Sequence, residues 1–355
     1  MPIFRNIGVD GVAVFFLDCS LEIFRMPVLR VLIALAVLVV SRAASAEPES
    51  ADNALPGLTK VEVKSSLDGE LQPVLYWAPE SARKESTPLF IFLHSWSGDY
   101  RQNNSKWQAE AVKRGWIYLH PNFRGVNQTP KACGSKWARQ DILDAVDFAT
   151  KEFKVDSERI YLAGTSGGGH MAMLMAGHHP DRFSAVSAWV GISDLAAWYE
   201  FHVKDGKPQR YARMILSSLV GAPGSKKEID ADFKDRSPIH HLHRAVGLPL
   251  QICAGINDGH TGSVPISHSL NAFNVVARAQ NAEAISQADI ASLLKRQQVP
   301  ADLDAAAKQI PIKFGREIVF ARESGKASVI IFDGGHEGLP VPACDWLDSQ
   351  ARVTR

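Results

Sequence analysis

Three residues of this sequence, a serine, an aspartate and a histidine, have the types and surroundings needed for acyl transfer. Ser166 is the centre of Gly164-Thr-Ser-Gly-Gly168, a match to the G-x-S-x-G pattern. Asp258 and His336 lie in two later glycine-rich segments. A serine hydroxyl becomes a nucleophile when a histidine removes its proton and an acid orients that histidine. The three side chains therefore suggest hydrolysis through an acyl-enzyme.

The elements around Ser166 are those that such a serine needs. Residues 160–163 form a short apolar run typical of a buried strand, and residues 170–178 are rich in helix formers. A sharp strand-to-helix turn brings the residues two before and two after the serine almost into contact, and Gly164 and Gly168 carry no Cβ atoms to collide. A glycine-rich loop that only lets a helix pack closely on its sheet is the alternative interpretation. The strand before and the helix after favour the nucleophile.

The acid and the base are expected at the ends of two later strands. Where a G-x-S-x-G serine is the nucleophile, the chain order of the partners is serine, acid, histidine. Asp258 follows a predicted strand at 248–254, and His336 follows one at 329–332. Asp194 and Asp333 are competing acids, but Asp258 comes one strand after Asp194, where this arrangement places its acid.

The other histidines are interpreted as structural or as pocket residues. A cation at the end of a helix offsets the helix dipole, which suits His178 and His179. The group His240, His241 and His243 suggests metal ligands, but no cysteine or carboxylate lies at ligand spacing, so we interpret it as a solvated loop. His260 and His268 are candidates for lining the pocket. No metal and no cofactor are expected.

Two backbone amides are expected to bind the oxyanion. One belongs to Gly167, directly after the nucleophile, and the other to the loop after the strand at 88–94. In that loop Trp96 is the predicted donor.

The order of elements predicts an α/β fold. Apolar runs predict strands near 59–64, 71–77, 88–94, 116–120, 160–163, 185–190, 248–254, 318–322 and 328–332, and helical periodicity predicts helices near 104–114, 140–154, 170–178, 267–282 and 285–297. This alternation indicates a mostly parallel central sheet with helices on both faces, and an antiparallel edge hairpin at its N-terminal end. Residues 196–219 are rich in aromatics and helix formers, and residues 220–243 are expected to be loop-like.

We divide the chain into a signal peptide at 1–46, a flexible lead-in at 47–58 and one domain at 59–355. Residues 195–245 form a lid-like insertion in that domain. The division at the N-terminus rests on an apolar run at 31–40, which is followed by Ala44-Ser-Ala46.

Export is the localisation that this N-terminal pattern predicts. The apolar run follows Arg30, as in a secretory signal peptide, and it is shorter than the roughly 20 residues of a membrane-spanning helix. Met26 begins a more usual signal peptide than Met1 does, so we expect Met26 to be the true start. The mature protein is then periplasmic or secreted, with no stable membrane span after cleavage. A short anchor that is never cut is the alternative.

Composition excludes some partners and gives the redox context. The formal net charge of +1 offers no electrostatic basis for binding nucleic acid. Export would leave Cys133, Cys253 and Cys344 where disulfides form. Cys253 lies in a predicted core strand, whereas Cys133 and Cys344 are assigned to loops and are the expected pair.

With these residues placed, the chain resembles the α/β-hydrolase superfamily and, within it, the catalytic domain of the prolyl oligopeptidase family of serine peptidases. The resemblance extends from about residue 88 to the C-terminus and rests on Gly164-Thr-Ser-Gly-Gly-Gly-His170, Gly255-Ile-Asn-Asp258 with Val264-Pro265, and Gly334-Gly-His-Glu337. It implies the nucleophile, acid and base roles for Ser166, Asp258 and His336. The roughly 40 residues between Glu47 and Pro88 are too few for the β-propeller of large family members.

The resemblance implies a serine peptidase that acts on a small-molecule or peptide substrate. A carboxylesterase is the alternative, because both activities use the same acyl-enzyme chemistry. An alternative of another class is a non-catalytic exported binding protein that keeps the fold as a scaffold. The sequence does not indicate the oligomeric state.

Overall fold

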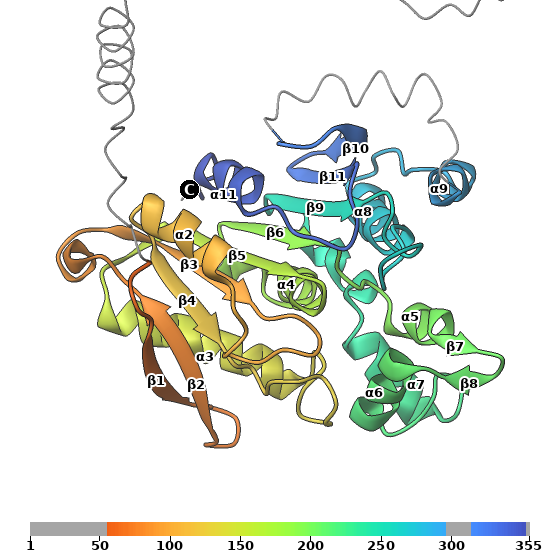
Figure 1. Ribbon diagram of the computed structural model, residues 1–355, viewed down its shortest axis with the longest axis horizontal. Coiled ribbons are helices and arrows are strands. Elements are labelled where there is room, and N and C mark those ends of the chain that lie inside the picture. The colour runs from red at the N-terminus through yellow and green to blue at the C-terminus, as the bar shows by residue number, and fades with distance from the viewer. Residues whose placement is uncertain (1–54, 296–313, 353–355) are drawn as a thin grey trace, which may run out of the picture. The chain divides into compact units, whose positions relative to one another are not determined.

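The computed structural model describes residues 55–295 and 314–352, and its centre is a nine-stranded sheet (Figure 1). The strand order is β1-β2-β4-β3-β5-β6-β9-β11-β10. The strands are β1 (Thr59–Lys64), β2 (Leu71–Trp77), β3 (Thr87–Leu93), β4 (Ile117–Pro121), β5 (Val155–Thr165), β6 (Ala185–Trp189), β9 (Leu250–Gly255), β10 (Ile318–Ser324) and β11 (Ala327–Phe332).

The middle of this sheet is parallel, and both of its edges are antiparallel. All neighbours from β4 to β11 pair in parallel. The strands β1 and β2 form the expected N-terminal hairpin, β2 also runs antiparallel to β4, and β10 runs antiparallel to β11. The parallel strands β3, β4, β6, β9 and β11 are buried along their whole length. Such burial on both faces explains why their sequences are continuous apolar runs.

Helices cover both faces of the sheet. Figure 1 shows α2 (Ser105–Lys113) and α11 (Pro340–Asp348) on one side, and α3 (Lys136–Glu152), α4 (Gly167–His178) and α8 (Ser267–Ala279) on the other. The helix α9 (Gln287–Leu294) follows α8. The predicted fold class, an α/β-hydrolase fold with a mostly parallel sheet and an N-terminal antiparallel hairpin, is confirmed.

The segment at 195–245, between β6 and β9, was expected to be a lid-like insertion, and we keep the name insertion for it. It has more regular structure than the sequence predicts. It contains α5 (Leu195–Phe201), a hairpin of β7 (Val203–Lys204) and β8 (Lys207–Pro208), α6 (Arg210–Leu219) and α7 (Lys227–Asp235). The prediction of a loop at 220–243 is wrong, because this stretch holds α7, the 3₁₀ helix Pro238–His240 and the start of the 3₁₀ helix Leu242–Ala245. A second, smaller hydrophobic cluster joins the insertion to the loop after β3, and it includes Trp96, Trp198 and Phe233.

The prediction of a Cys133–Cys344 disulfide is wrong. Cys133, Cys253 and Cys344 are free thiols, and all three are buried. Cys344 does not lie in a loop but in α11, where it packs into the main hydrophobic core. Burial raises the pKa of all three thiols, that of Cys133 to about 12.

The predicted signal peptide and most of the predicted lead-in lie outside the described residues. Among the helices of the described part, none has the length and apolar character required to cross a bilayer.

Candidate active site

The turn from β5 into α4 holds Ser166 in a strained backbone conformation. Its φ is 61° and its ψ is −117°, a combination that non-glycine residues rarely adopt. A Cβ atom on Gly164 would lie 2.3 Å from the carbonyl carbon of Gly168, so the expected close approach of these glycines is confirmed. The Ser166 amide donates to the carbonyl of Trp189 on β6 at 2.8 Å. The sheet therefore fixes the turn that presents the hydroxyl.

The structure brings Ser166, His336 and Asp258 into one chain of hydrogen bonds. The Oγ of Ser166 lies 2.8 Å from Nε2 of His336, and Nδ1 of His336 lies 2.7 Å from Oδ2 of Asp258. An ionised carboxylate only accepts hydrogen bonds, so Nδ1 carries the proton and Nε2 is free to accept one from the serine. The three residues follow β5, β11 and β9.

The Asp258 carboxylate is held by the backbone as well as by the histidine. It is 1% exposed, and its Oδ1 accepts from the amides of Gly259 at 2.9 Å and Val264 at 3.1 Å. These bonds fix the carboxylate and leave Oδ2 for His336. The competing acids lie elsewhere: Asp194 accepts from two amides at the start of α5, and Asp333 is exposed.

The backbone of Trp96 lies against Gly167, the residue after the serine. A Cβ atom on Gly167 would be 2.2 Å from the backbone nitrogen of Trp96. Gly167 is the first residue of α4, so its amide has no intrahelical acceptor and points out of the helix end. Within the described residues, the Trp96 amide donates to no backbone carbonyl. This arrangement has the form of an oxyanion hole.

Sequence reasoning missed a second hydroxyl at the reactive edge of the imidazole. The Oγ of Ser263 lies 3.5 Å from Nε2 of His336. The Ser263 carbonyl accepts from the indole of Trp198 at 2.7 Å and from the imidazole of His202 at 2.9 Å, so α5 holds this loop in place. No motif marks Ser263 in the sequence, because its position depends on contacts with the insertion.

Most of the remaining histidines near the sheet are structural. Burial lowers the pKa of His120, His170 and His268 to about 4, so they are neutral near pH 7. His268 lines a cavity of about 170 Å³ together with Asp194, whereas His260 contacts the carbonyl of Leu294 at 2.7 Å.

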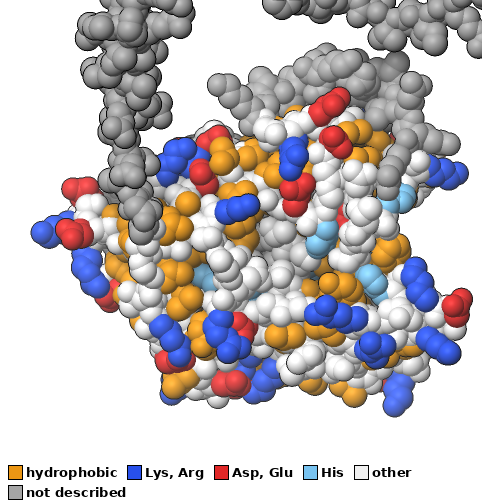
Figure 2. All heavy atoms as spheres, viewed as in Figure 1, with side chains coloured by type: hydrophobic (Ala, Val, Ile, Leu, Met, Phe, Trp, Pro, Cys, Tyr) orange, Lys and Arg blue, Asp and Glu red, His pale blue; other side chains and the backbone are white. Residues whose placement is uncertain are grey.

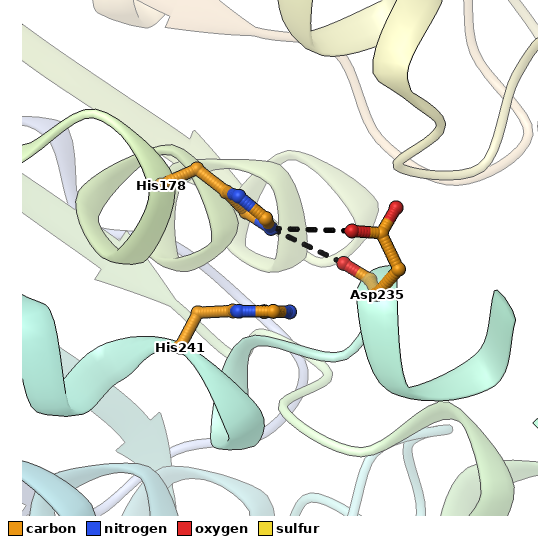
Figure 3. A group of neighbouring side chains, drawn as sticks. All are labelled: His178, Asp235 and His241. Carbon is orange, nitrogen blue, oxygen red and sulfur yellow. Dashed lines mark hydrogen bonds and ion pairs between the residues drawn. The ribbon is translucent and has the colours of Figure 1, made fainter. Parts of the chain in front are cut away.

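The cluster of His178, Asp235 and His241 has residue types that bind metals (Figure 3). Nε2 of His178 lies 3.2 Å from the carbonyl of Asp235, and Nε2 of His241 lies 3.0 Å from the carbonyl of Lys234. Each of these nitrogens therefore carries a proton, so only the Nδ1 atoms keep a lone pair, and that of His241 is buried without a hydrogen-bond partner. The Asp235 carboxylate is 3.0 Å from the Arg139 guanidinium, which repels a cation. The geometry fits a hydrogen-bonded cluster better than a metal site.

A mostly parallel sheet with a serine on the turn between a central strand and its helix defines the α/β-hydrolase class. Within this class the chain belongs to the prolyl oligopeptidase family, whose profile matches residues 103–289. The family is one of serine hydrolases. The matched residues include Ser166 and Asp258 and end before His336.

Individual relatives match only part of their own length. Dipeptidyl-peptidase 5 of Porphyromonas gingivalis is 38% identical over 106 residues, which are 26% of this chain and 15% of that protein. An acetylxylan esterase of Coprinopsis cinerea is 29% identical over 125 residues, which are 30% of this chain and 32% of the esterase. The uncomplexed acylaminoacyl peptidase of Pyrococcus horikoshii superimposes with a TM-score of 0.52 at 19% identity, over 81% of this chain and 39% of the peptidase. This last likeness concerns the fold alone.

Proposed function

We propose that this chain is an exported serine peptidase of the prolyl-oligopeptidase type that works through an acyl-enzyme at Ser166. The observation that carries the proposal is the unbroken series of hydrogen bonds from Ser166 through His336 to Asp258. Each bond has the length and the order that nucleophile activation needs.

The proposed reaction begins with the proton of His336 on Nδ1, which leaves Nε2 free to accept the proton of Ser166. Nε2 of His336 takes the hydroxyl proton while Oγ of Ser166 bonds to the acyl carbon, and the carbonyl oxygen becomes an oxyanion between the amides of Gly167 and Trp96. The imidazolium then gives that proton to the leaving group as the acyl–leaving group bond breaks. Water attacks the acyl-enzyme by the same steps in reverse and frees the serine. Asp258 stays ionised throughout and holds the imidazole.

Peptide cleavage is the activity that we favour. It is supported by family membership and by the similarity to dipeptidyl-peptidase 5. The second candidate is carboxylester cleavage, which the similarity to an acetylxylan esterase supports.

Export is supported by the apolar run at 31–40 and the small residues at 44–46. Mass measurement of the protein recovered from cells tests export, because it locates the N-terminus.

Labelling with a fluorophosphonate tests the catalytic proposal. We expect the wild-type protein to be labelled and Ser166→Ala not to be labelled. Aminoacyl and prolyl amides are then compared with p-nitrophenyl esters as substrates. Turnover of esters alone would favour the esterase, and a folded wild-type protein that resists labelling would favour a non-catalytic binding protein.

A further inference from the structure

A cavity of about 370 Å³ lies beside the loop that carries Trp96, the predicted oxyanion donor. Its lining includes Ser97, which directly follows Trp96, and Arg210, Arg213 and Met214 from α6. Nη2 of Arg210 donates to Oγ of Ser97 at 3.2 Å, so the helix and the oxyanion loop form adjoining walls.

The two arginines bring positive charge to this cavity without a carboxylate to neutralise it. Within the described residues neither Arg210 nor Arg213 forms a salt bridge; Arg213 donates to the carbonyl of Pro208 at 3.0 Å. By contrast, Arg101 in the loop after β3 is paired with Asp99. Both cavity arginines are exposed, and their spacing of three residues places them on one side of α6.

The surrounding surface is mainly but not wholly basic, because α7 carries four acidic side chains beside its two lysines. Figure 2 shows Lys and Arg side chains gathered over the part of the molecule that holds α6, α7 and the β7–β8 hairpin. Lys204 and Lys207 of that hairpin are exposed, as is Asp205 between them. The field of these groups favours the approach of an anion.

The geometry points to a carboxylate-binding subsite, formed by Arg210 and Arg213, for the acyl half of the substrate. A guanidinium presents paired donors that match the two oxygens of a carboxylate. The leaving group must lie at Nε2 of His336, from which it takes its proton. The cavity is instead lined by Ser97, the residue after Trp96, whose amide is the proposed donor to the acyl oxygen. The preferred substrate therefore carries a carboxylate on its acyl portion, a conclusion that rests on the proposed function.

The test compares two esters that differ only in charge: the p-nitrophenyl monoester of adipic acid and its methyl ester. With the full chain we expect kcat/KM to be about tenfold higher for the free acid, as for a charge-assisted pair at an exposed site. The double variant Arg210→Gln/Arg213→Gln should lose this preference, measured as the ratio of its kcat/KM values for the two esters. Arg278→Gln, which removes an exposed arginine of α8, should keep the preference.

Two further measurements separate a binding role from a structural one. Raising the salt concentration to about 0.5 M should reduce the preference in the wild type, because the arginines are exposed and are screened. Arg210→Lys/Arg213→Lys should keep part of the preference, because it retains the charge and loses the paired donors.

Equal kcat/KM for the two esters in the wild type would overturn the inference, as would a preference that survives in the double glutamine variant. Fluorophosphonate labelling without turnover of either ester would also overturn it. In these cases the proposed function stands, since labelling of Ser166 reports on it separately. Absence of both labelling and turnover would overturn the proposed function and the subsite together.

Discussion

The backbone nitrogen of Trp96 lies so close to Gly167 that a Cβ atom on the glycine would approach it to 2.2 Å. No real Cβ contact is that short, so a side chain at position 167 must push the backbones of Gly167 and Trp96 apart. The close approach of the two backbones thus depends on glycine at this position.

We therefore expect Gly167→Ala to lose activity without losing the hydroxyl or the histidine. Loss of one oxyanion donor typically lowers kcat by about 10²–10³. Steady-state kinetics on an activated ester measures this. Gly335→Ala is a matched control, because the nearest atom to its added Cβ would be 4.0 Å away, and it should change kcat little. Equal losses in the two variants would argue against the oxyanion role of Trp96.

The two aspartates that competed in the sequence can be separated by substitution. Asp258→Asn removes the charge that holds Nδ1 of His336 and should lower kcat by about 10³–10⁴. Asp194→Asn should have little effect, because asparagine caps a helix about as well as aspartate and the α5 amides keep an acceptor. The comparison of kcat on one ester decides the assignment, and a larger loss for Asp194→Asn would refute it.

Two hydroxyls lie near Nε2 of His336, and only the nearer one is the proposed nucleophile. The distances are 2.8 Å for Ser166 and 3.5 Å for Ser263. Ser263→Ala should be labelled by a fluorophosphonate like the wild type, since the backbone carbonyl of this residue still binds Trp198 and His202. Peptide mapping should find the label on Ser166. A label on Ser263 would reverse the roles of the two serines.

Acid should destabilise the protein through its buried histidines. Burial lowers the pKa of His120, His170 and His268 from 6.5 to about 4 in the folded state. The unfolded chain therefore takes up protons first, and stability present above pH 6.5 is lost as the pH falls toward 4. Each group contributes up to about 1.4 kcal/mol per pH unit in this window. Urea unfolding near pH 7 and pH 5 measures the loss, and equal free energies of unfolding would contradict it.

The three buried thiols should be free and unreactive in the native protein. A thiol-specific reagent should modify Cys133, Cys253 and Cys344 slowly under native conditions and rapidly in denaturant, because burial keeps them protonated and covered. Mass spectrometry of protein alkylated without reduction counts the thiols. A disulfide-linked peptide containing Cys133 and Cys344 would restore the original expectation.

The sequence was most informative where one local rule determined the structure. The parallel strands are continuous apolar runs, and the turn at Ser166 needs its glycines for steric reasons, so both could be predicted. We expected Ser166, Asp258 and His336 to lie close together because each follows the end of a strand and their chain order is serine, acid, histidine. The structure places them together. Their catalytic roles stay a prediction.

The errors occur where local signals are weak. The helix α7 is short and largely charged, and its apolar stripe consists of little more than Ile229 and Phe233, which is too short to reveal it. The helix α11 begins at Pro340 and has Pro342 in its first turn, where proline is tolerated, but these prolines made the segment resemble a loop. This error also led to the mistaken disulfide. Ser263 and the arginine cavity depend on packing of the insertion, which no spacing rule gives.

The order of the strands that carry the site makes activity a reporter of complete folding. Ser166 and His336 are separated by 170 residues, and the strands β5, β6, β9 and β11 must all pair in register before Oγ and Nε2 meet. Long-range parallel pairing of this kind forms slowly compared with helices. During refolding, recovery of turnover should therefore follow the return of helical signal, and it should mark the moment when the last parallel strand joins the sheet.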